Sequence, residues 1–202
     1  MVGGYIYRST DSGATWTLTT APQQLWQSVA SSADGTKLVA VGYMLDPAGN
    51  WIGGYIYTSS DSGATWTQTG TQQEWKSVAS SADGTKLVGV VSGYLNAGYI
   101  YTSVDSGATW TQQTRSTQQG WWSVASSSDG TKLVAVAGGI YNVDYIYTSA
   151  DSGATWTQQT RSTQQGWLSV ASSSDGTKLV AVAYGGYIYT STDSGATWTQ
   201  SQ

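Results

Sequence analysis

Side chains able to carry out acid–base or nucleophilic chemistry are few in this sequence. Its 202 residues include no His and no Cys, which excludes His- and Cys-based nucleophilic triads and the common zinc sites. Glycoside hydrolysis needs two suitably spaced carboxyl groups. Outside the repeated turns described below, only Asp46, Glu74 and Asp144 remain, and Glu74 lacks a convincing partner. We therefore expect no enzyme activity, no bound metal and no cofactor.

A second possible chemistry is sugar binding by aromatic rings that lie beside amides. The C–H faces of a sugar stack on aromatic rings, while amides bond its hydroxyls. The candidate ligand-binding residues are Trp26, Trp75, Trp121, Trp167, Tyr43, Tyr94, Tyr141, Tyr184, Gln73, Gln119, Gln165, Arg115 and Arg161. Two alternatives stay open. The four Trp rings could instead fill gaps between structural units, and the two Arg side chains could be ordinary solvated charges.

These candidates belong to a repeat that covers the chain. Asp-Ser-Gly-Ala-Thr-Trp-Thr occurs five times, at spacings of 50, 44, 46 and 42 residues. Trp-x-Ser-Val-Ala-Ser-Ser-x-Asp-Gly-Thr-Lys-Leu-Val occurs four times and alternates with it. Residues 99–137 and 145–183 differ only at Val104 versus Ala150 and Trp122 versus Leu168. This near identity indicates a recent internal duplication.

Each repeat predicts four short β-strands and no helix. Tyr-Ile-Tyr-Thr-Ser, Thr-Trp-Thr-Gln, Trp-x-Ser-Val-Ala-Ser and Lys-Leu-Val-Ala-Val are rich in β-branched and aromatic residues, and Asp-Gly or Ser-Gly turns separate them. A period of about 40 to 50 residues with four strands per unit is typical of a β-propeller blade.

Ser-Thr-Asp-Ser-Gly-Ala-Thr-Trp at residues 9–16, with its four copies, resembles the Asp-box, or bacterial neuraminidase repeat, Ser-x-Asp-x-Gly-x-Thr-Trp. Sialidases, some glucan hydrolases, sortilin-type receptors, photosystem assembly factors and some bacterial lectins carry this box. The resemblance implies that the box forms the turn between the third and fourth strands of a blade. Trp-x-Ser-Val-Ala-Ser then becomes the innermost strand of the next blade, and Lys-Leu-Val-Ala-Val its second strand.

The box residues are expected to be structural. A short Asp side chain can accept hydrogen bonds from the turn, Gly permits a positive φ, and the Trp buries its ring against the sheet. This applies to Asp11, Trp16, Asp61, Trp66, Asp105, Trp110, Asp151, Trp156, Asp193 and Trp198. We also expect the Tyr-x-Tyr strands to be core, the Asp-Gly turns to be structural, and the Lys residues after those turns to be solvated.

The predicted fold is an all-β propeller of about five blade units in one domain. The units are a half blade at 1–20 and blades at 26–69, 75–114, 121–160 and 167–202. Five outer hairpins therefore face only four inner hairpins. Three resolutions are open: a five-bladed ring with one deficient blade, strand exchange between chains, or a segment of a longer array. Because exposed edge strands favour pairing, the unmatched terminal hairpin predicts a possible homo-oligomer.

The leading functional hypothesis is a non-catalytic, lectin-like propeller that binds glycans on its variable loop face, between blades. A sialidase is not indicated, because the three Arg residues do not form an evident triad. The alternatives are a scaffold for protein interaction or assembly, and a repeat-amplified or engineered propeller without a selected ligand. Repeated aromatic–amide pockets would favour the lectin. Dependence on the single long connection Gly42–Gly53 would favour the scaffold.

Charge and hydropathy exclude further partners. The net charge is −4, with a pI near 4.4 and no basic stripe, so we expect no nucleic-acid binding. No stretch approaches the roughly 20 apolar residues of a membrane span, so we expect no membrane insertion. The first residues enter a strand at once and give no sign of a signal peptide. This pattern suits a cytoplasmic protein or an already trimmed secreted one.

Overall fold

The computed structural model describes residues 3–92, 98–114, 116, 118–140 and 142–201, and all regular structure in these ranges is β. A hairpin of β1 (Tyr7–Arg8) and β2 (Thr17–Leu18) precedes four antiparallel sheets of four strands each. The first two blades contain β3 (Leu25–Ser31), β4 (Leu38–Leu45), β5 (Trp51–Ser59) and β6 (Thr67–Gln73), then β7 (Trp75–Ser80), β8 (Leu87–Val91), β9 (Ile100–Ser103) and β10 (Thr111–Gln112). The third and fourth contain β11 (Trp121–Ser126), β12 (Leu133–Ala137), β13 (Ile146–Ser149) and β14 (Thr157–Gln159), then β15 (Trp167–Ser172), β16 (Leu179–Ala183), β17 (Ile188–Ser191) and β18 (Thr199–Ser201).

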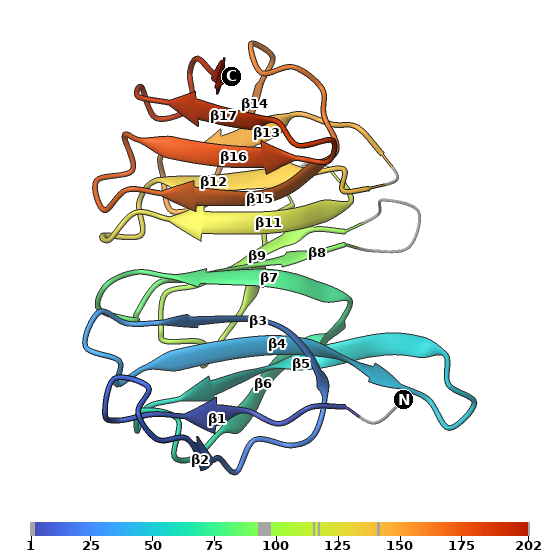
Figure 1. Ribbon diagram of the computed structural model, residues 1–202, viewed down its shortest axis with the longest axis vertical. Helices are drawn as coiled ribbons and strands as arrows, with labels where there is room; N and C mark the ends of the chain where they lie inside the picture. Colours follow the sequence, from blue (N-terminus) through green and yellow to red (C-terminus); the bar gives the residue numbers. More distant parts are fainter. Residues whose placement is uncertain (1–2, 93–97, 115, 117, 141, 202) are drawn as a thin grey trace.

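The order of strands within each sheet follows the chain, from the innermost strand to the fourth. This confirms the predicted all-β propeller of four-stranded blades, with four complete blades and an N-terminal half blade. No helix in the described ranges is long and apolar enough to cross a membrane. In Figure 1 the blades follow one another along the longest axis, with the β1–β2 hairpin at one end and the fourth blade at the other. A closed five-bladed ring is therefore not formed within the chain.

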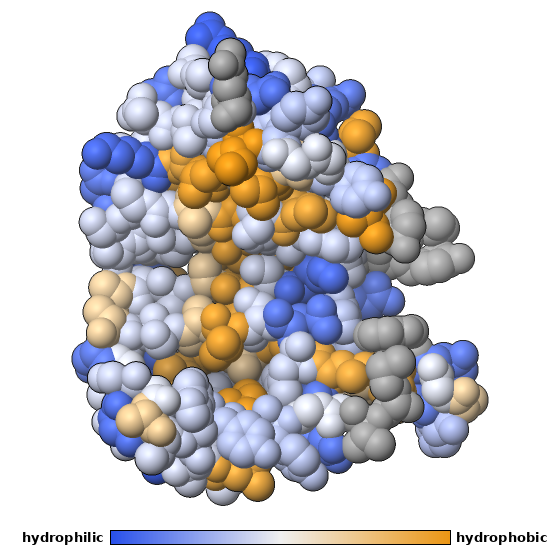
Figure 2. Space-filling view, viewed as in Figure 1, coloured by the Kyte–Doolittle hydropathy of each residue, from blue (hydrophilic) through white to orange (hydrophobic). Residues whose placement is uncertain are grey.

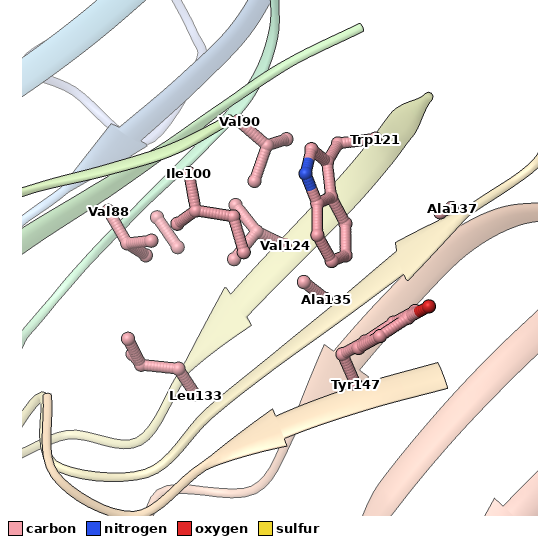
Figure 3. Close-up of a cluster of buried hydrophobic side chains, with 10 residues drawn as sticks. Val88, Val90, Ile100, Trp121, Val124, Leu133, Ala135, Ala137 and Tyr147 are labelled. Carbon is pink, nitrogen blue, oxygen red and sulfur yellow. The ribbon is translucent and has the colours of Figure 1, made fainter. Parts of the chain in front are cut away.

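The core lies between blades rather than within one sheet. In Figure 3 Val88, Val90 and Ile100 of the second blade meet Trp121, Val124 and Leu133 of the third, and all six are buried. Equivalent clusters join the first blade to the second and the third to the fourth. Since burying one such side chain stabilises a fold by about 1.5–3 kcal/mol, each blade depends on the next for its stability.

Polar contacts repeat between blades in the same direction. The amide of Ala33 donates to the carbonyl of Ala82 in the next turn at 2.7 Å, and the series continues through Ser128 to Ser174. The prediction that the Lys side chains are merely solvated is wrong for the second blade. The Nζ of Lys86 donates to the carbonyl of Asp129 in the third blade at 2.9 Å, because the turns of adjacent blades lie side by side.

Each Asp box is a closed hydrogen-bonded turn. In the box at Asp105, the Oδ1 atom accepts from the hydroxyl of Ser103 and the amide of Thr109, and Oδ2 accepts from the Thr109 hydroxyl. The hydrogen bonds from Thr109 are the largest cause that lowers the Asp105 pKa to about 2. The following Ser106 has a φ of 60°, a left-handed conformation that non-Gly residues adopt at a cost. The box thus uses its polar groups for the turn itself.

Two expectations about buried aromatic residues fail at the ends of the array. Trp16 is 64% exposed, although the Trp residues of the other four boxes are half-buried. Tyr7 is 51% exposed, whereas its equivalents Tyr57, Tyr101, Tyr147 and Tyr189 are buried, and Tyr5 and Tyr187 are each about half exposed. For Trp16 and Tyr7 the physical reason is that the half blade lacks inner strands, whereas in a complete blade the inner Trp covers both rings, as Trp75 covers Tyr101 and Trp110.

Candidate functional site

The two faces of the array differ in what they offer a ligand. Asp boxes and Asp-Gly turns lie along one face, and the longer connections lie along the other, which we call the loop face. Here β4 and β5 extend beyond the other strands (Figure 1). Their turn is closed by Asp46, whose carboxylate accepts from the amides of Ala48 and Asn50 and from the Asn50 side chain. The hydrogen bonds from Asn50 are the main cause that lowers the pKa of Asp46.

Three of the four Trp residues proposed as sugar platforms are inaccessible. Trp75, Trp121 and Trp167 are 0% exposed. The Trp121 ring packs edge-on against Tyr147, with centroids 4.9 Å apart, and the other two make equivalent contacts. The hypothesis that they stack on sugars is therefore corrected, because they fill the gaps between blades. Trp26, at the open end, is half-buried and packs against Tyr57.

Most other sequence candidates are also engaged within the fold. The side-chain amides of Gln119 and Gln165 donate to the hydroxyls of Tyr147 and Tyr189. Tyr43 is buried. Gln73 is half-buried, and Tyr184 and Arg161 are exposed. Tyr94, Tyr141 and Arg115 lie outside the described residues. Among the candidates that the structure describes, the engagement of Trp75, Trp121, Trp167, Gln119 and Gln165 within the fold therefore counts against the repeated aromatic–amide pockets of the lectin hypothesis.

The carboxyl groups are likewise held by their surroundings. Asp144 accepts from the amide of Tyr145 at 2.7 Å and from the Tyr147 hydroxyl at 3.2 Å, and Asp46 closes its own turn. Within the described ranges no cluster of three or more acidic side chains could hold a metal ion.

Sequence reasoning missed a row of four residues at the start of the innermost strands. Each innermost strand carries a register irregularity directly after its first Trp, between Trp26 and Ser28 in β3 and at the equivalent places in β7, β11 and β15. A β-bulge redirects a side chain and is common beside functional sites. The residues at these positions are Gln27, Lys76, Trp122 and Leu168, which we call the bulge row. The sequence did contain a signal for these four positions, because their residues differ from blade to blade while the Trp before them and the Ser after them repeat.

Two members of the bulge row touch each other across the boundary between the second and third blades. The Nζ of Lys76 lies 4.1 Å from the centroid of the Trp122 ring, a distance at which cation and ring attract. Burial lowers the pKa of Lys76. Trp122 also lies against Gly139, where an added Cβ would clash with the ring. The half-buried ring is thus in contact with both a cation and a backbone segment.

A cleft of ≈600 Å³ opens at the N-terminal end of the array. Tyr5, Tyr7 and Trp16 of the hairpin line one side, and Trp26, Val29 and Leu38 of the first blade line the other. The half blade lacks the two inner strands that occupy the corresponding space in the complete blades. The cleft is therefore a consequence of the missing inner hairpin.

No family model matches the sequence, and no curated protein matches it either. Solved structures do. All of those compared below are β-propellers. A GH74 xyloglucanase from Xanthomonas campestris is 18% identical over 98% of this chain and 34% of its own, with a TM-score of 0.68. YCF48 bound to D1 peptide is 18% identical over 98% and 62%, with a TM-score of 0.65.

A nidogen–laminin complex contributes a third similar chain, 13% identical over 97% of this chain and 71% of its own, with a TM-score of 0.68. The present chain spans about a third of the xyloglucanase and less than two thirds of YCF48. At these identities the similarity establishes the fold, and the set includes both a glycoside hydrolase and propellers captured with peptide or protein partners.

Proposed function

We propose that this protein is a non-catalytic propeller that binds a peptide segment of a partner protein across the bulge row. The observation that carries the proposal is the difference in chemistry along the row. It presents an amide at Gln27, a cation at Lys76, an indole at Trp122 and an aliphatic side chain at Leu168. An unsymmetrical row suits one unsymmetrical ligand, whereas several equivalent sugar sites would need the same residues in every blade.

The burial of the repeated Trp residues supports the same choice. A lectin with several equivalent sites would gain avidity from exposed repeats, but the rings that repeat are core. The loop-face hairpin of β4 and β5, with its closed turn, stands beside the row and adds a second non-repeated surface. Among the similar structures, YCF48 was captured with a peptide and another propeller within a nidogen–laminin complex.

The expected ligand is an extended peptide with an acidic and an apolar side chain. Lys76 can bind a carboxylate on the side that faces away from Trp122, and the ring and Leu168 can take up an apolar side chain. The Trp122 indole already packs against both Lys76 and Gly139, so little side-chain entropy is lost when a ligand orders it.

The test is a selection of random peptides displayed on phage against the intact chain, followed by affinity measurement on the enriched peptides. The decisive variant is Trp122→Leu, because the copied block already holds Leu168 at this position and the fold therefore tolerates it. The matched control is Val104→Ala, the other difference between the two blocks, which lies beside an Asp box.

We expect enriched peptides to carry an acidic residue, to lose at least tenfold in affinity with Trp122→Leu and to bind the Val104→Ala variant unchanged. The same protein preparation is also applied to a glycan array, which tests the competing lectin hypothesis by measuring binding to sugars. Glycan binding that survives Trp122→Leu, or a peptide selection that yields no binder, contradicts the proposal.

A further inference from the structure

The two ends of the array expose complementary halves of the contact that joins its blades. We define the tail face as Val180, Val182 and Ile188 of the fourth blade. In the third blade the equivalent residues are at most 1% exposed, because Trp167, Val170 and Leu179 of the following blade cover them. Val180 and Ile188 of the tail face are 37% and 45% exposed. Figure 2 shows hydrophobic side chains gathered over this blade, in the upper half of the view.

The head face, at the other end, consists of Trp26, Val29 and Leu38 of the first blade. Their equivalents in the second blade, Trp75, Val78 and Leu87, are at most 6% exposed and cover the first blade. Val29, in contrast, is 63% exposed. The head face therefore holds the residue types that cover an apolar blade face at three places inside the chain.

Polar contacts end at the same two faces. Val78, Val124 and Val170 each donate their amide to the hydroxyl of a Ser in the preceding blade, at 3.2–3.4 Å. By position, the next pair in this series is Ser169 of the fourth blade and Val29 of the head face. The amide series from Ala33 to Ser174 stops at the same blade. Lys178, the equivalent of Lys86, is exposed.

From these observations we propose that the 202-residue chain associates head to tail, with the tail face of a second copy seated on the head face of the first. The internal contacts supply the geometry, since they pack these residue types together three times. Such a contact uses two different surfaces, so repetition either closes a ring or extends a fibre. The occupant of the ≈600 Å³ cleft is then the inner hairpin β15–β16 of the second copy.

The β1–β2 hairpin lies where the outer strands of the docked blade must go. Residues 3–17 are identical to residues 185–199 except for Arg8 against Thr190, so β17–β18 of the second copy is an almost exact replacement. The hairpin is a separate two-stranded sheet, and an isolated hairpin is only marginally stable. Its hydrogen bonds to the first blade include those from the Arg8 guanidinium to the carbonyls of Asp61 and Ser62 at 3.5 and 3.4 Å. We infer that β17–β18 displaces it.

The first experiment measures mass against concentration by analytical ultracentrifugation. We expect the chain to exceed the single-chain mass of 21.3 kDa and the Val180→Lys variant to need at least tenfold more protein to associate. Val104→Lys is the matched control, because Val104 is 71% exposed and lies on neither end face. A variant without residues 1–20 should associate more tightly, since the competing hairpin is gone. A single-chain mass at every concentration overturns the proposal, as does association that is lost with the hairpin.

A second experiment identifies which surfaces meet. The sequence has no Cys, so Ser169→Cys and Val29→Cys each introduce one thiol, at the tail and the head face. A short bismaleimide should link the two variants when they are mixed and should link neither with itself. Tail-to-tail products overturn the proposal. A chain carrying both substitutions that is linked only within itself also overturns it, because the array would then close alone.

Discussion

Replacing Trp121 by Ala tests whether the repeated Trp residues are core or ligand platforms. Trp121 is fully buried and packs against Tyr147 and Trp156. Truncating a buried Trp costs about 3–5 kcal/mol, and loss of an edge-on aromatic pair adds about 0.5–1.5 kcal/mol. We expect the free energy of unfolding to fall by about 3.5–6.5 kcal/mol, a large part of the total for a domain of this size.

The matched comparison is Trp26→Ala, at the same place in the first blade. Its ring is half-buried, lines the cleft and packs edge-on against Tyr57, so we expect a loss of about 2 kcal/mol. Urea unfolding monitored by circular dichroism measures the loss of unfolding free energy for both variants. The slope of unfolding free energy against urea concentration should be equal for the two variants if their unfolded states are alike. Losses of equal size, or a loss below about 1.5 kcal/mol for Trp121→Ala, would refute the assignment of these rings to an inter-blade core.

Three further predictions concern turns and contacts. Hydrogen bonds lower the pKa of four box carboxyl groups, those of Asp11, Asp61, Asp105 and Asp193, to about 2 against 3.8 for the free side chain, so they stabilise the fold above pH 4. The melting temperature should be level above pH 5 and fall as the pH drops from 4 to 2, as a thermal scan would show. Gly139→Ala should lower the free energy of unfolding by about 2 kcal/mol more than Gly185→Ala. Both glycines have a positive φ, but only at Gly139 would the added methyl group clash with a side chain, that of Trp122. Trp fluorescence should therefore shift in the Gly139→Ala variant and not in the Gly185→Ala variant. Ser123→Ala removes a hydrogen bond to the next blade and should cost about 1 kcal/mol in urea unfolding, whereas Ser169→Ala should cost almost nothing unless the chain has associated.

The repeat predicted the strands and their order because each unit has its own turn chemistry and apolar alternation. The Asp-Gly and Asp-box turns punctuate the chain, and hydrogen bonds close them as expected. Those signals are local. They act within about ten residues, and a sequence therefore shows them directly.

What the repeat could not reveal depends on neighbours in space. Trp16 and Trp110 share one motif, yet Trp16 is exposed and Trp110 half-buried, because Trp110 packs against Trp75 of the innermost strand of its own blade and the half blade of Trp16 has no such strand. The bulge row was missed for a related reason. Attention to repeated aromatic residues favoured Trp75 and Trp121, whereas the informative residues were the neighbours that vary, Lys76 and Trp122.

The equivalence of the contacts between blades bears on how such a chain evolves. Residues 99–137 and 145–183 are near copies, and each copy meets its neighbours through the same Trp, Val and Leu positions. Duplication or loss of a whole unit therefore creates no unfamiliar boundary that later substitutions would have to repair. Copy number can drift while every junction stays well packed. Diversity then accumulates at positions outside the repeated apolar core of the junctions, such as the position of Trp122 and Leu168.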